Sequence, residues 1–416
     1  MLFAIDASNV VLFSKQQNMK HQKLFICKLA TLIDASSTAH KHQEPVAFAK
    51  TVSKLFANIV IASTEHSAAF NVDNIQFAST TQWCLQVQQA TSNDVVLLWQ
   101  DCMSFFDKYA NSALTEQLSL QLGSWCHAKC RRFALTTDLR YRFNETQQDM
   151  AQQLFGYAFE QPDNVVELCQ AQIAYEDGLF KQVHLPLQIN AAVLPMHLQC
   201  SDSTNVADIE KQVVTCIANW RSVHKPLQDK TYRLCFSSAG IKGLDKHRFD
   251  IMHKCLLEYN KKLQDNFVGD CCNFITTHVD AELSQLLLKD ASIKSRLDIS
   301  WQVPYERMFE QLSKSCCQLI AGDNLYDSHH LLSNKWVEGC LADTVNLVVG
   351  TWDPMPINLH KVFFDSDSIN SKLWYNTVNY FAYSEFASKQ IVELQWEQFK
   401  DWCTTYFVEL QKCFSS

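Results

Sequence analysis

Short apolar runs alternate with stretches of helical periodicity along most of the chain. In the first half we expect strands at 2–7, 58–63, 94–99 and 131–138, and helices over 22–33 and 112–125. In the second half the same alternation predicts strands at 232–238, 317–322 and 344–349, apolar runs at 265–270 and 296–303, and helices over 246–263, 305–315, 333–342 and 390–414. Such a βαβα order is typical of open parallel sheets covered by helices.

The alternation loosens around residues 185–230, where three prolines and many turn-forming residues occur. A chain of 416 residues exceeds what one ordinary core accommodates, so we expect two domains. We place an N-terminal domain at 1–200, a linker at 201–228, a second domain at 229–388 and a C-terminal helix at 389–416. The predicted fold is α/β, with two Rossmann-like doubly wound domains and an inter-domain cleft that receives a ligand at the carboxyl ends of the strands.

The composition indicates a soluble globular protein, with 47% hydrophobic and 19% charged residues. No apolar run reaches the ~18 residues of a membrane span, and no basic segment precedes the apolar N-terminus, so neither a membrane anchor nor a signal peptide is expected. The 17 cysteines are odd in number and lack paired CxxC spacing, which favours buried thiols in a reducing cytoplasm and no metal site. The net charge of −8 argues mildly against a nucleic-acid binder.

A strand that runs into a loop of Ser, Ala and Gly, and then into a helix, occurs at 235–250. The backbone N–H groups of such a loop and the N-terminus of the following helix suit a phosphate group, and nearby cations add charge. The candidate residues are Ser238, Gly240, Lys242 and Arg248. The segment is neither a P-loop nor a dinucleotide fingerprint, so an ordinary strand-to-helix turn stays open as the alternative.

The segment FALTTDLRYRF delivers Asp138 at the carboxyl end of a predicted strand. A carboxylate there, facing the cleft, can act as a general base; alternatively, Asp138 caps the next turn and pairs with Arg140. Basic residues gather around it in a protein that is acidic overall: His127, Lys129, Arg131, Arg132, Arg140 and Arg142. Such a patch suits a polyanionic acceptor, and a solvated basic face is the alternative.

After the Gly322-Asp323 turn, a predicted helix carries Lys335 and Glu338 about one helical turn apart. The cation could meet a diphosphate, and the carboxylate could accept hydrogen bonds from both hydroxyls of a ribose. The alternative is a surface ion pair of negligible worth.

Together these segments resemble the phage DNA β-glucosyltransferases of the T-even viruses. The most specific match is WQVPYERMFEQLSKSCCQLIAGDNLYDSHHLLSNKWVEGCLADTVNLVV, with an aliphatic residue before Pro304, an amphipathic helix, Gly-Asp-x-x-Tyr, and then a basic residue followed three positions later by Glu. ALTTDLRYRF is similar to the strand end that carries the family's catalytic Asp, SNVVLFSK to its first strand and loop, and CMSFFDK to its double-Phe loop on the DNA side. The resemblance spans most of the chain in order.

The resemblance implies a role for each matching residue. Asp138 would be the catalytic base, the backbone of Val303 would contact uracil, and Glu338 would bind the ribose. The implied donor-binding set is Gln22, which stands where the family has a glutamate near the sugar, with Ser238, Gly240, Lys242, Arg248, Val303, Asp323, Tyr326, Lys335 and Glu338. The expected DNA-binding set is Ser104 and Phe106, near the extruded base, with Lys129, Arg131, Arg132, Arg140 and Arg142.

The resemblance also implies a GT-B fold, with the last helix crossing back onto the first domain, and an inverting transfer from UDP-glucose to 5-hydroxymethylcytosine in duplex DNA. Such a modification is of the kind that helps phage DNA evade restriction. Because this chain is acidic, longer than the family, and carries Gln22 in place of the glutamate, a UDP-pentose such as UDP-arabinose is an alternative donor.

The expected partners are therefore a UDP-sugar and hydroxymethylated duplex DNA, with Mg²⁺ or Mn²⁺ as an optional activator. We expect a monomer that acts in the cytoplasm, that of the host cell if the protein is viral. Two other functions stay open: a GT-B enzyme that acts on a non-DNA acceptor, and a non-catalytic module that binds a nucleotide or DNA.

Overall fold

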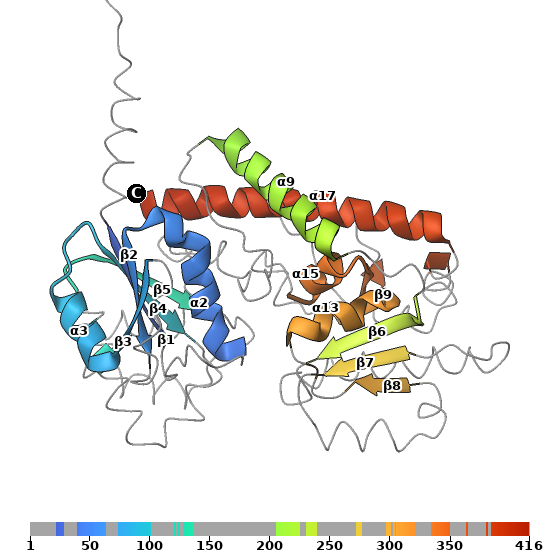
Figure 1. Cartoon of the computed structure of the whole chain (residues 1–416), viewed down its shortest axis with the longest axis horizontal. Coiled ribbons are helices and arrows are strands. Elements are labelled where there is room, and N and C mark those ends of the chain that lie inside the picture. The colour runs from blue at the N-terminus through green and yellow to red at the C-terminus, as the bar shows by residue number, and fades with distance from the viewer. Residues whose placement is uncertain are drawn as a thin grey trace, which may run out of the picture. The chain divides into compact units, whose positions relative to one another are not determined.

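A computed structural model describes the chain at residues 22–28, 40–63, 74–100, 120–121, 124, 128–136, 205–224, 230–238, 272–276, 297–300, 303, 305–321, 334–349, 363–364, 380–381 and 384–415. The chain divides into two compact units, one of Met1–Cys216 with Cys403–Ser416 and the other of Ile217–Trp402. Each unit contains one parallel sheet with helices beside it (Figure 1). No helix in the described part of the chain is long and apolar enough to span a membrane.

The sheet of the first unit has five parallel strands in the order β3-β2-β1-β4-β5. Its elements are β1 (Lys23–Lys28), α2 (His40–Val52), the 3₁₀ turn η1 (Ser53–Leu55), β2 (Asn58–Ser63), β3 (Ile75–Ser79), α3 (Thr80–Gln88), β4 (Val95–Gln100) and β5 (Arg131–Thr136). Figure 1 shows α2 and α3 on opposite sides of this sheet. Cover on both faces explains why β1 is buried along nearly its whole length rather than on alternate residues.

The sheet of the second unit has six strands, all paired in parallel, in the order β11-β10-β9-β6-β7-β8. Its strands are β6 (Tyr232–Ser238), β7 (Cys272–Thr276), β8 (Leu297–Ser300), β9 (Ser315–Ala321), β10 (Val345–Val349) and β11 (Phe363–Phe364), with helices α13 (Tyr305–Ser313) and α15 (Asn334–Leu341). In each sheet the strand order reverses at an interior point: between β1 and β4 in the first, and between β6 and β9 in the second.

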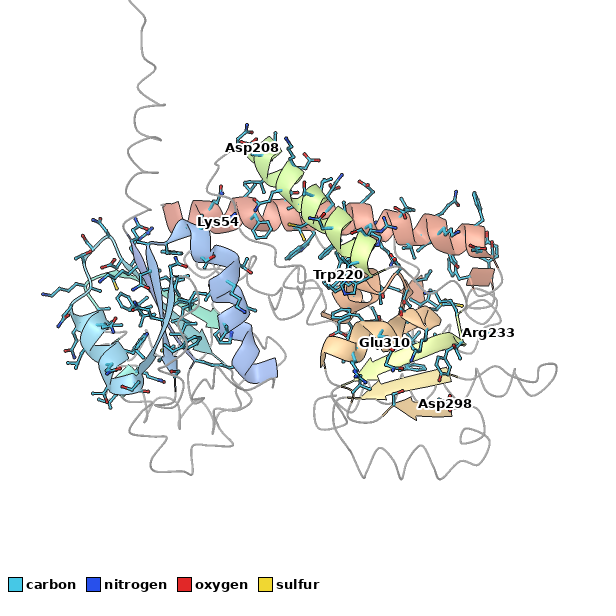
Figure 2. The ribbon with its side chains drawn as sticks, viewed as in Figure 1. Lys54, Asp208, Trp220, Arg233, Asp298 and Glu310 are labelled. Carbon is cyan, nitrogen blue, oxygen red and sulfur yellow. The ribbon has the colours of Figure 1, made fainter. Side chains whose placement is uncertain are left out.

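Two long helices, α9 (Val206–Val223) and α17 (Glu385–Ser415), contain the points at which the chain is divided between the units. Within the second unit, the last turns of α9 are anchored by Trp220 (Figure 2). Its indole Nε1 donates to the carbonyl of Leu341 at 3.1 Å, and its ring packs edge-on against Phe309 with the centroids 5.6 Å apart. This contact joins α9 to both α13 and the end of α15.

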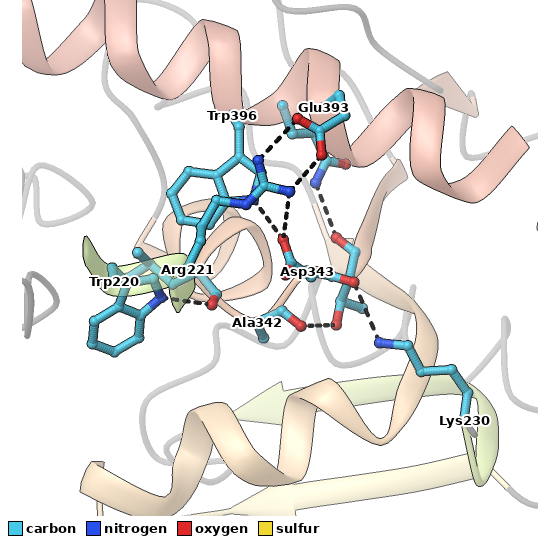
Figure 3. A network of polar contacts seen from close by, with 10 residues as sticks. Trp220, Arg221, Lys230, Ala342, Asp343, Glu393 and Trp396 are labelled. Carbon is cyan, nitrogen blue, oxygen red and sulfur yellow. Dashed lines mark hydrogen bonds and ion pairs between the residues drawn. The ribbon is translucent and has the colours of Figure 1, made fainter. Parts of the chain in front are cut away.

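The turn after α15 is the centre of a buried polar network (Figure 3). The N–H groups of Asp343 and Thr344 donate to the carbonyls of Cys340 and Gly339, at 3.1 and 2.9 Å, so the helix ends in a Schellman motif. Asp343 occupies the left-handed position, with φ 51°, where glycine is commonest and Asp is tolerated. Its carboxylate accepts a hydrogen bond from Nε1 of Trp396 on α17, which a glycine could not do.

Charged side chains from α9, from α17 and from the segment just before β6 lie around Asp343. The guanidinium of Arg221 donates to both carboxylate oxygens of Glu393 and lies 5.3 Å from the ring centroid of Trp396. These bonds raise the pKa of Arg221 and lower that of Glu393. Burial raises the pKa of the Asp343 carboxyl, against the opposing effects of the Trp396 hydrogen bond and of Arg221. Burial also lowers the pKa of Lys230, whose Nζ donates to the carbonyl of Asp343 at 3.3 Å.

Most of the strands and helices expected from the sequence are confirmed. The strands predicted at 58–63, 94–99, 131–138, 232–238, 317–322 and 344–349 correspond to β2, β4, β5, β6, β9 and β10, and the helices predicted over 305–315, 333–342 and 390–414 correspond to α13, α15 and α17. The run at 296–303 contains β8. The segments 2–7, 246–263 and 265–270 lie outside the described residues, and of 112–125 only residues 120, 121 and 124 are described, all helical.

One expectation is wrong. The helix predicted over 22–33 is instead the central strand β1, because a strand buried on both faces shows no alternation and its apolar run resembles one face of a helix. The segment expected as a linker at 201–228 contains the 18-residue helix α9, which begins where the side chain of Asn205 accepts a hydrogen bond from the N–H of Ala207 at 3.0 Å. The division of the chain between the two units, after Cys216, falls within this helix. The elements α2, η1, β3, α3, β7 and β11 were not expected.

The substitution Asp343→Asn tests the buried turn. Asn keeps an acceptor for Trp396 and tolerates positive φ, but it stays neutral at every pH. Because the pKa of Asp343 is raised in the folded state, its contribution to stability is present below the unfolded pKa and is lost as pH rises through the folded value. The free energy of unfolding of the wild type, relative to Asp343→Asn, should therefore fall as pH rises above the ordinary carboxyl value of about 4.

Urea denaturation at a series of pH values measures this difference, with the same substitution at the exposed Asp208 as the baseline. A difference that is constant, or that grows in favour of the wild type as pH rises, would contradict the assignment of Asp343 as a carboxylate that is costly to bury charged.

Candidate functional site

The candidate site lies at the carboxyl edge of the second sheet, where the strand order reverses between β6 and β9. These strands pair in parallel, so their ends at Ser238 and Ala321 share one edge. In doubly wound sheets a ligand binds at this edge, beside the reversal. The two segments that follow, 239–250 and 322–333, lie outside the described residues and contain Gly240, Lys242, Arg248, Asp323 and Tyr326. The topology thus brings the starting points of both candidate loops together.

A buried ion pair stands on the helix that follows β9. The Nζ of Lys335 lies 2.8 Å from Oε2 of Glu338, and the side chain of Glu338 is only 3% exposed while that of Lys335 is 30% exposed. A carboxylate so removed from water is costly unless it is paired, so this pair differs from the solvent-screened surface pair that the spacing alone allowed. Such a carboxylate can accept hydrogen bonds from a ligand's hydroxyls, while the partly exposed ammonium group of Lys335 can reach an anionic group.

Two further residues of the expected donor site are described. Ser238 is the last residue of β6 and pairs with Thr276 at the end of β7, so its backbone reaches the carboxyl edge. Val303 lies between β8 and α13, and its side chain is buried in a cluster with Cys235, Met308, Leu312 and Ala342. This packing fixes the segment whose backbone the resemblance assigns to uracil.

In the first unit, every strand ends in a polar residue at the carboxyl edge: Lys28, Ser63, Ser79, Gln100 and Thr136. Lys28 and Ser63 are almost fully buried there. Asp138 follows β5 by two residues, just outside the described part of the chain. The strand that leads to the candidate base is therefore the edge strand of a sheet whose carboxyl ends are polar.

Sequence reasoning missed Lys28, which stands at the end of the central strand. The expected helix over 22–33 concealed it. The run Leu24–Cys27, ended by a lysine, was the available signal, since a cation after an uninterrupted apolar run is an unusual way to end a buried strand.

Gln22, Lys129 and Arg131 lie at the opposite, amino edge of the first sheet. The Nη2 of Arg131 donates to Oε1 of Gln22 at 3.2 Å, and the backbone N–H of Arg131 donates to the carbonyl of Asp94 at 3.1 Å. Five residue steps along β5, roughly 17 Å, separate Arg131 from the carboxyl edge. The roles expected for Gln22, Lys129 and Arg131 stay predictions from the sequence.

For the other residues expected to contact DNA, the structure describes no side chain. Ser104, Phe106, Arg140 and Arg142 lie outside the described residues, and of Arg132 only the backbone in β5 is described. Their roles stay predictions from the sequence.

The chain matches no protein-family model and no curated protein. Solved structures match it over nearly its whole length. The DNA-modifying enzyme β-glucosyltransferase, solved with and without uridine diphosphoglucose, aligns with a TM-score of 0.56 at 12% identity over 95% of this chain and 100% of its own.

Two other structures align with a TM-score of 0.51 at 9% identity. One is an α-glucosyltransferase in complex with UDP and a 13-mer DNA containing a central A:G mismatch, over 91% of this chain and 94% of its own. The other is an α,α-trehalose-phosphate synthase (UDP-forming) from Burkholderia xenovorans, over 95% of this chain and 100% of its own. At such low identity these matches establish the fold: the chain has the GT-B fold of glycosyltransferases, with two Rossmann-like α/β units, as the sequence predicts.

The substitution Lys335→Met tests whether the Lys335–Glu338 ion pair contributes to stability as a buried pair does. It should lower the free energy of unfolding by roughly 1–3 kcal/mol, because the carboxylate of Glu338 keeps its buried position without the lysine. Adding Glu338→Gln should restore part of the loss, since a neutral amide is less costly to bury.

The matched control is Lys389→Met, which breaks the pair with Glu385 on α17, where the two side chains are 73% and 81% exposed. That substitution should have little effect. Urea denaturation measures all three variants. Equal losses at Lys335 and Lys389, or no recovery in the double variant, would rule out the interpretation of a buried pair.

Proposed function

We propose that this protein is an inverting glycosyltransferase that moves a sugar from a UDP-sugar to 5-hydroxymethylcytosine in duplex DNA. The observation that carries the proposal is the buried carboxylate of Glu338, paired with Lys335, on the helix that follows β9 at the strand-order reversal of a GT-B chain. The sequence of that segment resembles the donor-binding part of the phage DNA β-glucosyltransferases.

In the proposed donor complex, Glu338 accepts hydrogen bonds from the 2′- and 3′-hydroxyls of the ribose. Lys335, which neutralises Glu338 in the free protein, then lies close enough to serve the diphosphate. Ser238, Gly240, Lys242 and Arg248 supply N–H groups and charge at the end of β6, and the backbone of Val303 contacts uracil. Asp323 and Tyr326, in the segment after β9, complete the proposed set.

The proposed reaction is a single displacement at the anomeric carbon. The hydroxyl oxygen of the extruded base forms the new bond to that carbon, the bond to the UDP oxygen breaks, and UDP leaves with the bonding electrons. Asp138 takes the hydroxyl proton as the oxygen attacks. Cations and N–H groups around the diphosphate stabilise the charge that grows on the leaving group. Extrusion of the base is needed because its hydroxymethyl group is otherwise enclosed in the duplex.

Two observations support DNA as the acceptor. The sequence resemblance includes the Thr-Asp-Leu-Arg strand end and the double-Phe segment with Ser104 and Phe106. Among proteins of the same fold, one is a DNA-modifying enzyme and another was solved with DNA. Glucose and a pentose such as arabinose remain the two donor sugars, and Mg²⁺ or Mn²⁺ is proposed only as an activator. We further propose that the enzyme is a cytoplasmic monomer.

A non-DNA acceptor is the second candidate. The chain carries a net charge of −8, and Lys129 and Arg131 lie at the amino edge of their sheet rather than beside the strand end that leads to Asp138. Both features would suit a small or uncharged alcohol better than a polyanion. One protein of the same fold is a UDP-forming trehalose-phosphate synthase.

Replacing Asp138 by Asn should lower the transfer rate by roughly 10²–10⁴-fold, because the attacking hydroxyl loses its base. The affinity for UDP should stay unchanged, since Asp138 belongs to the first unit and the residues proposed to bind the uracil, ribose and diphosphate belong to the second. The transfer rate is measured from the release of UDP, and the affinity for UDP is measured by calorimetry. A fully active Asp138→Asn variant would exclude this residue as the base.

Nucleoside mass spectrometry after incubation with a panel of UDP-sugars tests the function. On hydroxymethylcytosine duplex DNA we expect a hexose or a pentose increment on the modified cytosine, and none on unmodified DNA. Transfer to small alcohols but never to this DNA would select the second candidate. If the protein binds UDP but neither transfers a sugar to any acceptor nor hydrolyses the donor, a non-catalytic binding function would be favoured.

A further inference from the structure

The helix that carries Glu338 lies very close to the sheet at the next residue, Gly339. A Cβ on Gly339 would lie 2.0 Å from Oδ1 of Asn346 and 2.4 Å from Oε1 of Gln318, so no larger residue fits without a shift of the helix or of these side chains. Asn346 on β10 and Gln318 on β9 are partners in register, and both are buried. Two amide oxygens therefore form the floor on which α15 rests.

Asn346 also bonds to the helix directly. Its Nδ2 donates to the carbonyl of Trp336 at 2.9 Å, one turn before Gly339 on α15. This bond fixes which way the amide faces, with Nδ2 toward Trp336 and Oδ1 toward Gly339. Asn346 therefore contacts α15 at two points, at the carbonyl of Trp336 and beneath Gly339, and an apolar residue of the same size could not make the bond to Trp336.

The position of Asn346 is in turn held from α17. The backbone N–H of Asn346 donates to Oε1 of Gln395 at 2.9 Å, and Nε2 of Gln395 donates to the carbonyl of Thr344 at 2.9 Å. Strand β11 pairs with β10 only at Val348 and Val349. The amide of Gln395 therefore supplies, at the start of β10, the donor and acceptor that a neighbouring strand would otherwise provide.

We propose that Gln395, Asn346 and Gly339 are positioning residues that hold the carboxylate of Glu338 for the ribose of the nucleotide. The inference rests on the proposed function, because it assigns these residues to the ribose end of the donor site. A lift or rotation of α15 moves Glu338 away from the ribose hydroxyls, while the contacts proposed for the diphosphate at the end of β6 do not depend on α15. The specific consequence is a loss of selectivity for the 2′-hydroxyl, not merely a loss of stability.

The test compares the affinities for UDP and 2′-deoxy-UDP by calorimetry. The wild type should bind UDP roughly tenfold more tightly than 2′-deoxy-UDP, the worth of one hydrogen bond to a charged group. Gln395→Met keeps the length of the side chain, removes both amide bonds and should bring this ratio close to one. Gly339→Ala should do the same. Gln390→Met is the matched control, because Gln390 is exposed on the same helix, and it should keep the wild-type ratio.

A purely structural role would weaken both ligands by the same factor and leave the ratio intact. A wild-type ratio in Gln395→Met, measured on protein whose melting temperature shows that it is folded, overturns the inference; this holds even if Gly339→Ala fails to fold. An equal fall of the ratio in Gln390→Met overturns it as well. A wild-type protein that binds no uridine nucleotide would instead overturn the proposed function, so the two failures are distinguishable.

Discussion

The close packing of α15 against β9 and β10 is the constraint on which the candidate site depends. Gly339 allows the helix to approach Asn346 and Gln318, and the preceding residue, Glu338, is thereby carried below the surface of the unit. Packing in protein interiors is dense, so the place of this carboxylate is decided by what lies beneath the helix. The far end of the same helix is closed by the turn at Asp343, which α9 and α17 hold through Arg221 and Trp396.

In both units the polar residues that stabilise the fold and the candidate functional residues lie at opposite edges of the sheet. At the amino edges, polar side chains bond to the backbone and to one another: Asp94 accepts from the N–H of Lys23, and the hydroxyl of Thr344 donates to the carbonyl of Leu312. At the carboxyl edges, the edge strand β5 of the first sheet leads toward the candidate base, and β6 and β9, which flank the reversal of the second sheet, lead into the segments that hold the candidate phosphate ligands. Parallel strands impose this division, because all of their carboxyl ends meet at one edge.

The sequence allowed the fold class and most strands to be predicted, because apolar runs such as 58–63 and 232–238 are bounded by clear turns. It misassigned the segment that begins at Lys23, where burial on both faces removes the alternation that identifies a strand. The pair of Lys335 and Glu338 was found from spacing and resemblance, but its burial was not, since exposure depends on packing against β10. The roles proposed for Gly339, Asn346 and Gln395 could not be predicted from the sequence, because the contacts join residues up to 51 positions apart.

Competitive labelling of lysines by an amine-reactive reagent tests the central claim most directly, namely that a uridine nucleotide binds beside Glu338 and Lys335. Lys335 is partly exposed, and Lys389 on α17 provides an exposed reference within the same molecule. With saturating UDP, the labelling of Lys335 should slow severalfold while that of Lys389 stays constant. Unchanged labelling of Lys335, under conditions in which calorimetry shows that UDP is bound, would place the nucleotide elsewhere and contradict the claim.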